Sequence, residues 1–452
     1  MTLRSISAAL AASFLCAAGC GGDDDGGGGG GDSGGDGQSH AFCLRIENVG
    51  PVYDLVHAGT FDTGVGADAP GPIGPGGAFE VSFTAGRGAR LSFATMFAES
   101  NDFFFAPDGD GIPLYDDAGA PIAGDVTDRV ALWDVGTEMN QEPGLGPDQA
   151  PRQEAPDQGS PDPDPRVRPG PDSFGNLPPV ADVIRVTLTP GADQSFRLRI
   201  ENVSTASTLM TSNGDSKPVP LSPGSFAVHE APNPLFTVGE EDRGEGLERI
   251  AEAGLAMRLG RAVDADEGVT VPLSPGVWIV HQDAAPLFAA GESDRGDGLE
   301  RIAEDGDPAA LGAALANENA GVFDTAVGAS AAGPIMPGQA FEVELTASPG
   351  DRLSFATMFA QSNDVFFAPT AEGIALFDGD EPIAGDVTDA VSLWDVGTEE
   401  NQEPGVGNDQ APRQLAPDTG AADGLPVQTI AERDDGYSYP AASDLIRVTL
   451  EP

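Results

Sequence analysis

The chain is poor in basic residues. Its 452 residues include 22 Lys and Arg against 73 Asp and Glu, which gives a formal net charge of −51. Lys217 is the single lysine. A surface this acidic repels the phosphate backbone, which excludes nucleic acid as a partner. It is compatible with solubility in high salt, with attraction for divalent cations or with lineage bias, so charge alone names no function.

Long apolar runs are missing as well. The one apolar stretch near the start, 6–18, follows Arg4 and is too short to span a bilayer, so residues 1–20 are expected to be a signal peptide. It ends in Ala-Ala-Gly-Cys20, which resembles the lipobox of bacterial lipoproteins and implies a lipid anchor at Cys20 in the cell envelope. Ordinary secretory cleavage is the alternative. Residues 21–40, rich in Gly and Asp, are predicted to form a flexible tether.

Cysteine is equally scarce, with three residues in the whole chain. Cys16 lies in the signal segment and Cys20 is the expected anchor, so Cys43 is left without an internal disulfide partner. We therefore expect Cys43 to be a small buried apolar residue in a strand.

Gly and Pro, by contrast, are abundant, with 61 and 39 residues spread through the chain as turn punctuation. Between the turns, short segments such as 42–49, 79–83 and 184–188 alternate apolar and polar residues, which is typical of half-buried strands. The sequence predicts an all-β protein built from antiparallel β-sandwiches.

A long internal repeat divides the chain. Leu91–Phe97 recurs as Leu353–Phe359, and the Leu-Trp-Asp-Val-Gly-Thr-Glu segment at 132–138 recurs at 393–399. A period of this length indicates duplication of a whole domain. The strand-like segments at each end predict a shortened first domain, 41–190, and a second domain, 195–452. Because the join between them is short, we expect the two domains to touch.

A second, shorter repeat lies inside the second predicted domain. The segment 219–254 recurs as 271–306 at a constant offset of 52 residues. Each unit reads as a strand, a turn and a short helix, with Leu247, Ile250 and Ala251 on one helical face. Slippage explains the doubling, and one of the two units is expected to be surplus to the fold.

The long repeat preserves acidic residues in both copies. Asp102 precedes an aromatic run, and Asp134 and Glu138 flank a turn at Gly136; their counterparts are Asp364, Asp395 and Glu399. Three carboxylates held together repel one another unless a cation lies between them, and oxygen-only ligation favours Ca²⁺ over zinc. Solvated acidic loops are the alternative, because recent duplication preserves neutral residues too.

The same segments resemble the spondin N-terminal domain. The pattern Ser-Asn-Asp-[aromatic], followed by Leu-Trp-Asp-Val-Gly-Thr-Glu, carries the resemblance. It implies two tandem C2-like sandwiches, each with calcium at loops at one end, held by Asp102, Asp134 and Glu138 and by Asp364, Asp395 and Glu399. Glu138 and Glu399 replace an aspartate of the animal motif, and Val365 replaces the aromatic residue in the second copy.

Other candidate residues point to alternatives. His229 and His281 occupy equivalent places in the 52-residue units and are expected to be structural rather than metal ligands. Asp134 and Glu138 also form the acid/base pair of a hypothetical secreted polysaccharide hydrolase. The leading hypothesis is a non-catalytic, calcium-binding adhesion protein that meets an extracellular glycan or cell-surface protein. A purely structural envelope lipoprotein is the third reading.

Overall fold

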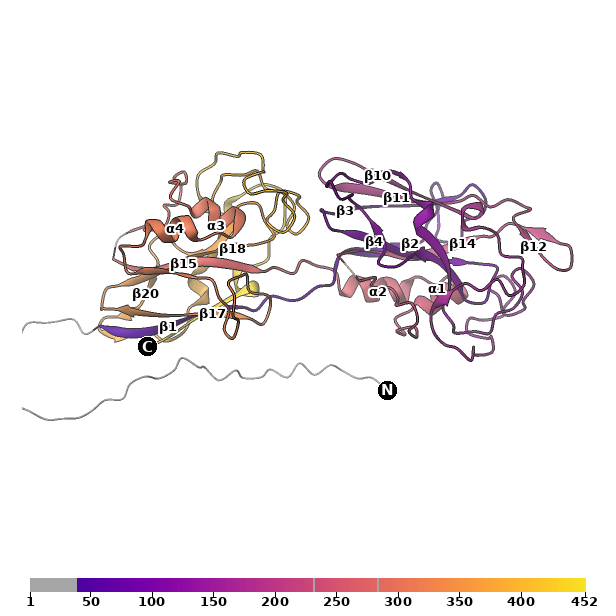
Figure 1. The fold of residues 1–452 in the computed structure, drawn as a ribbon, viewed down its shortest axis with the longest axis horizontal. Coiled ribbons are helices and arrows are strands. Elements are labelled where there is room, and N and C mark those ends of the chain that lie inside the picture. Colours follow the sequence, from indigo (N-terminus) through magenta and orange to yellow (C-terminus); the bar gives the residue numbers. More distant parts are fainter. Residues whose placement is uncertain (1–38, 231, 283) are drawn as a thin grey trace, which may run out of the picture.

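The computed structural model describes residues 39–230, 232–282 and 284–452, and shows two β-sandwiches lying side by side (Figure 1). Each sandwich pairs a four-stranded sheet with a larger antiparallel sheet, and helices cover the outer face of the larger one. The predicted all-β sandwich class is confirmed. The predicted signal peptide, the anchor Cys20 and nearly all of the tether lie outside the described residues.

The first sandwich contains strands from the middle of the chain. Its smaller sheet has the order β3 (Ala78–Thr84), β11 (Ser195–Asn202), β10 (Ile184–Pro190), β7 (Gly124–Asp125). Its larger sheet has the order β2 (Leu55–Phe61), β14 (Leu221–His229), β4 (Arg90–Phe97), β5 (Phe103–Pro107), β8 (Val130–Asp134), β9 (Arg168–Pro169), with β6 (Ile112–Pro113) beside β4. It also includes the hairpin of β12 (Leu209–Met210) and β13 (Ser216–Lys217), helices α1 (Leu247–Ala253) and α2 (Met257–Ala265), and 3₁₀ turns at Thr127–Arg129 and Val180–Asp182.

The second sandwich repeats this plan. Its smaller sheet has the order β17 (Ala340–Ala347), β1 (His40–Asn48), β26 (Ile446–Glu451), β23 (Gly385–Asp386). Its larger sheet has the order β16 (Ala320–Phe323), β15 (Leu273–His281), β18 (Arg352–Phe359), β19 (Val365–Pro369), β24 (Val391–Asp395), β25 (Gln428–Thr429), with β20 (Ile374–Ala375) beside β18. The remaining elements are β21 (Phe377–Asp378), β22 (Glu381–Pro382), α3 (Leu299–Asp305), α4 (Ala309–Ala314), α5 (Ala442–Leu445) and 3₁₀ turns at Thr388–Ala390 and Ile430–Glu432.

Alternation along the strands builds the core between the sheets. In β1 the side chains of Phe42, Leu44 and Ile46 are buried, while Arg45 and Glu47 between them are partly exposed. The central strands of the larger sheets are buried on both faces, because one face meets the smaller sheet and the other meets the helices. Strands with alternating buried and exposed side chains are therefore found mainly in the smaller sheets, each of which has one face toward solvent.

The division at residues 190–195 is not a domain boundary. Strands β10 and β11 pair along their whole length, from Ile184 opposite Asn202 to Pro190 opposite Phe196. The segment between them is a tight hairpin turn in which Asp193 and Gln194 adopt positive φ. Because a short hairpin closes at little entropic cost, β11 takes the place between β10 and β3.

The first strand of the chain consequently completes the second sandwich. β1 pairs with β17 on one side and with β26 on the other. At the end of β1, Asn48 Nδ2 also donates to the carbonyl of Val271, 223 residues further along the chain, at 2.9 Å. In Figure 1 this indigo strand lies with the elements of the C-terminal half. The first sandwich is thus contained within residues 51–268, and it is inserted between β1 and β15 of the second.

Neither 52-residue unit is surplus. The predicted strand and helix of each unit are confirmed as β14 with α1 and as β15 with α3. β14 lies between β2 and β4 in the first sandwich, and β15 lies between β16 and β18 in the second. The first domain is therefore not shortened. It receives its copy of the unit from residues that follow β11 rather than from residues that precede β2.

Cys43 departs from the expectation in one respect. Its side chain is buried in β1, as predicted. The structure also has it disulfide-bonded, so the expectation of an unpaired Cys43 is wrong.

The sandwiches touch, as expected, although the segment 189–195 on which that expectation was based lies within the first sandwich. The backbone N–H of Arg87 in the first sandwich donates to Asn408 Oδ1 at 2.8 Å, and the Arg87 guanidinium donates to the Asn408 carbonyl at 2.9 Å. Asn408 Nδ2 also lies 3.2 Å from the hydroxyl of Tyr115. Among the helices of the described segments, none has the length and apolar character needed to cross a bilayer.

The exchanged position of β1 is testable with matched substitutions. Ile46 in β1 and Ile200 in β11 occupy equivalent, fully buried positions. We expect Ile46→Ala to lower the free energy of unfolding of the second sandwich by about 2–5 kcal/mol, and Ile200→Ala to do the same to the first. Urea unfolding followed by tryptophan fluorescence separates the two when each variant is made with Trp133→Phe, which leaves the tryptophans of the second sandwich, and with Trp278→Phe and Trp394→Phe, which leave that of the first. A simple tandem order requires the opposite assignment.

Candidate metal centre

Two of the predicted ligands are brought together by strand pairing. Asp102 immediately precedes β5, and Asp134 is the last residue of β8. The antiparallel register places Phe103 opposite Asp134, so the two aspartates lie at the same end of the larger sheet. The equivalent register in the second sandwich places Val365 opposite Asp395, next to Asp364. Both sites are thus fixed by rigid neighbouring strands.

Asp102 is fully buried and only half satisfied. Its Oδ2 accepts the backbone N–H groups of Thr137 at 2.9 Å and Glu138 at 3.0 Å. Its Oδ1 is buried without a hydrogen-bond partner. In the second sandwich Asp364 repeats both features, with N–H donors at 2.8 and 3.0 Å from Thr398 and Glu399. A buried, unpaired carboxylate oxygen in both copies is the kind of atom that a cation or an ordered water satisfies.

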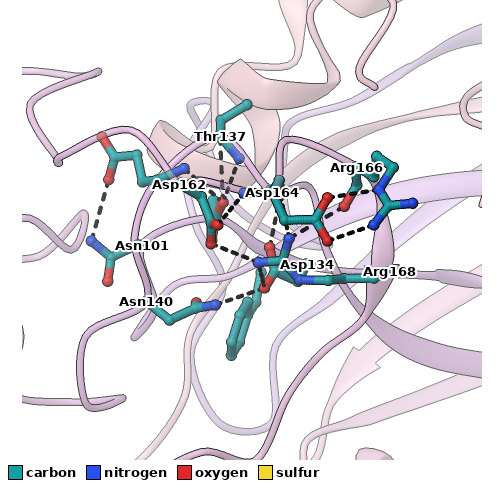
Figure 2. A network of polar contacts seen from close by, with 12 residues as sticks. Asn101, Asp134, Thr137, Asn140, Asp162, Asp164, Arg166 and Arg168 are labelled. Carbon is teal, nitrogen blue, oxygen red and sulfur yellow. Dashed lines mark hydrogen bonds and ion pairs between the residues drawn. The ribbon is translucent and has the colours of Figure 1, made fainter. Parts of the chain in front are cut away.

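Asp134 is held by an arginine rather than left open (Figure 2). Its Oδ2 accepts from Arg168 Nη2 at 2.8 Å and from Asn140 Nδ2 at 2.6 Å, while its Oδ1 accepts the N–H of Gly136 at 2.8 Å. Arg168 also bonds Asp162 at 2.7 Å. The Asp134 charge is therefore largely neutralised by the protein itself.

Glu138 joins a different group of carboxylates. The ligand oxygens of Glu138, Asp157 and Glu252 all lie within 4.8 Å of one another. Glu138 Oε1 accepts the N–H of Gly159 at 2.6 Å, which holds the Asp157 loop against it. Glu252 comes from α1 and accepts the Thr137 hydroxyl at 2.7 Å. Over the residues that the structure describes, Asp102, Asp134 and Glu138 do not form one such group.

The second sandwich builds the same group from equivalent residues. Glu304 on α3, Glu399 and Asp418 bring their ligand oxygens within 4.8 Å of one another. Glu399 accepts the N–H of Gly420 at 2.8 Å, and Thr398 donates to Glu304 at 2.6 Å. In both groups the two glutamates are buried and the aspartate is exposed, so each group opens to solvent on the aspartate side.

Burial and mutual repulsion raise the proton affinity of these carboxylates. Desolvation raises the pKa of Glu252 and of Glu304 to about 7, and the charges of Glu138 and Glu399 add to the effect. Desolvation also raises the pKa of Asp364 to about 8, with the charge of Asp395 as the next cause. Carboxylates tuned in this way hold a proton or a cation far more readily than exposed ones do.

The predicted trio is therefore divided. Asp102 and Asp134 lie together, as do Asp364 and Asp395, whereas Glu138 and Glu399 belong to the neighbouring three-carboxylate groups. The turn at Gly136 forms as expected, with φ of 79°, but it does not bring Glu138 to Asp134.

Glu252 and Asp157, with their counterparts Glu304 and Asp418, are not among the ligands predicted from the sequence. Glu252 recurs in the 52-residue units next to apolar helix positions, yet it is only 2% exposed. That acidic residue on a buried helical face was a usable signal. Asp157 offered a weaker one, because it recurs after the shared Ala-Pro dipeptide of both copies.

The two histidines occupy equivalent places within the larger sheets. Buried His229 contacts the Ser92 hydroxyl through Nε2 at 2.9 Å, and His281 contacts Ser354 in the same way at 2.9 Å. Burial and the nearby charge of Arg90 lower the pKa of His229 to about 4. These pairs tie β14 to β4 and β15 to β18 within the sheets.

The chain matches no protein-family model, and no curated protein matches it. The spondin resemblance consequently remains a prediction from the sequence motifs.

The raised carboxylate pKa values predict a pH dependence in metal-free buffer. Between the ordinary glutamate pKa of 4.5 and about 7, folded Glu252 and Glu304 bind more protons than the unfolded chain does. The free energy of unfolding therefore falls as pH rises through this window. We expect Glu252→Gln with Glu304→Gln to stabilise the protein at pH 8 in EDTA by roughly 1–2 kcal/mol for each residue, and to have little effect at pH 4.5. Urea titrations at both pH values measure this, and an equal effect at both would contradict it.

Proposed function

We propose that this chain is an exported calcium-binding protein, in which each sandwich holds a cation beside the loops that meet an extracellular ligand. The observation that carries the proposal is the paired three-carboxylate group. Glu138, Asp157 and Glu252 come from three separate segments, and their counterparts repeat the arrangement in the second sandwich. Carboxylates that are partly buried and this close together repel one another unless a proton, a basic side chain or a cation offsets their charge.

The donor set favours Ca²⁺. All candidate ligands are carboxylate oxygens, which suit a hard cation, and backbone carbonyls and water would fill the remaining positions. In each sandwich one buried carboxylate oxygen without a hydrogen-bond partner, Oδ1 of Asp102 or of Asp364, is a further acceptor. A bound cation would connect α1 to the loops after β8, because Glu252 and Glu138 lie on these elements. That connection would make the loops rigid enough to present a binding face.

The resemblance to spondin domains supplies the rest of the proposal. It points to an adhesion module, without catalytic activity, that binds a glycan or a cell-surface protein and is held at the envelope through Cys20. The hydrolase alternative is weakened at its proposed acid/base pair. Asp134 is fully buried, and its oxygens already accept hydrogen bonds from Gly136, Asn140 and Arg168. No observation on the described residues favours that alternative.

Thermal unfolding tests the cation. We expect millimolar Ca²⁺ to raise the melting temperature relative to EDTA, and equal Mg²⁺ to raise it less, because a ligand that binds only the folded state stabilises it. Glu252→Gln with Glu304→Gln should remove most of the calcium-dependent rise. The exposed pair Glu245→Gln with Asp297→Asn removes the same charge at equivalent positions and should leave the rise intact. Equal rises in both double variants would refute the assignment of these carboxylates.

A binding assay tests the ligand. The wild-type protein should be retained on a glycan array or on cell surfaces in calcium and released by EDTA. Asp102→Ala with Asp364→Ala should weaken this retention, because both remove the buried acceptors behind the sites. Retention that is indifferent both to EDTA and to these substitutions would remove calcium-dependent adhesion as the function, whatever the thermal result.

A further inference from the structure

A basic pocket lies between the sandwiches of this acidic chain. A cavity of about 380 Å³ is lined by residues of both sandwiches. Three arginines, Arg87, Arg90 and Arg413, share the lining with Tyr115, and Asp116 and Asp117 lie at its exposed rim. Three guanidinium groups against two carboxylates give the lining residues a small positive excess, although the chain as a whole carries −51.

None of these arginines is paired with a carboxylate in the described segments. Arg90 donates through Nε and Nη2 to the carbonyls of Asp110 and Gly111, each at 3.0 Å. Arg87 donates through Nε to Gly119 and through Nη1 to the carbonyls of Asn408 and Arg413. One terminal nitrogen of each side chain, Nη1 of Arg90 and Nη2 of Arg87, is left for another acceptor.

Arg413 is the most exceptional of the three. Its side chain is 6% exposed, and its partners are the Gly407 carbonyl at 2.9 Å and the amide oxygens of Gln361 and Gln410, all of them neutral. Burial lowers the pKa of Arg413 to about 10. The charge of exposed Glu230 acts in the opposite direction and raises this pKa. A buried charge without a counter-ion is costly.

The first sandwich shows how the same position is normally neutralised. Arg152 is the counterpart of Arg413, and it forms an ion pair with Glu99 at 2.8 Å. The counterpart of Glu99 in the second sandwich is Gln361. The scaffold is otherwise preserved, since Arg152 and Arg413 donate through Nε to equivalent glycine carbonyls. The internal anion is therefore missing only where the arginine lines a cavity.

We propose that this pocket binds an oxyanion, such as a sulfate or carboxylate group, which supplies Arg413 with the counter-ion that Glu99 gives Arg152. Arg87 and Arg90 add charge, and the Tyr115 hydroxyl adds a polar contact beside them. The cavity has room for more than the anion alone, so the group fits as a substituent of a saccharide as well as a free ion. This site involves none of the proposed calcium ligands, so it stands independently of the proposed function.

The test uses the whole exported chain at constant ionic strength. Sulfate, phosphate and glucuronate are titrated as sodium salts against sodium chloride, with melting temperature and calorimetry as readouts. Constant ionic strength keeps the repulsion from the net charge equal throughout. We expect saturable binding of at least one oxyanion and none of chloride. Tighter binding of glucuronate than of sulfate identifies an acidic saccharide as the source of the anion, and the reverse order identifies a sulfate group or free ion.

Gln361→Glu is the decisive variant. It restores the counter-ion of the first sandwich, so we expect it to raise the melting temperature without added anion and to weaken oxyanion binding at least ~tenfold. Sulfate also stabilises proteins by general exclusion from their surfaces, but that effect is the same in the wild type and in this variant. An equal response of the two would therefore overturn the proposal.

A second pair of variants guards against misfolding. Arg90→Gln removes a partly exposed member of the pocket and should weaken oxyanion binding, whereas Arg129→Gln removes the same charge from an exposed position elsewhere on the first sandwich and should not. Loss of binding in both, or in neither, would also overturn the proposal.

Discussion

The pairing of β1 with β17 and β26 determines how the whole chain is divided. Strand β10 turns directly into β11, and β11 thereby fills the position between β10 and β3 in the first sandwich. The equivalent position in the second sandwich lies between β17 and β26, and it remains for β1. Without β1, both neighbours would present unpaired backbone groups at the middle of a sheet. The N-terminal strand must therefore cross to the far sandwich.

This arrangement makes the first sandwich a permuted copy of the second. In the second, the order is the strand β1, then β15 with its helices, then the remaining strands. In the first, the remaining strands come first, and β11, β14 and their helices follow. The two joins of the inserted sandwich lie close together, since the Tyr53 N–H donates to Thr270 Oγ1 at 2.7 Å. An insertion whose ends meet disturbs its host little.

Much of this could be predicted from the sequence, and the remainder could not for identifiable reasons. Period-two alternation gave the strands, and the 52-residue repeat gave β14 with α1 and β15 with α3. Partner choice was out of reach, because β1 and β11 carry nearly the same residues and suit either sandwich equally. Hairpin closure decides between them, and the turn at 191–194 looked like a linker. Glu252 was missed because its helix was judged by its apolar residues alone.

The two copies also bear on whether the acidic groups matter. Shared residues alone are weak support, since duplication copies neutral residues as well. The arginines beside Asp134 and Asp395, however, are not equivalent residues. Arg168 lies opposite Asp134 in β9, whereas the residue opposite Asp395 in β25 is Gln428. In the second sandwich Arg433, from the following turn, contacts Asp395 through Nε at 2.7 Å.

Non-equivalent arginines thus reach equivalent carboxylates, an outcome that duplication does not copy. Both arginines bond a second equivalent aspartate, Asp162 or Asp423. Neutralisation of this aspartate is therefore a physical requirement of the site, met twice by separate means. Because the protein supplies the positive charge at Asp134 and Asp395, the three-carboxylate groups that still lack one are Glu138, Asp157 and Glu252 and their counterparts. The cation is accordingly expected at those groups rather than between Asp102 and Asp134.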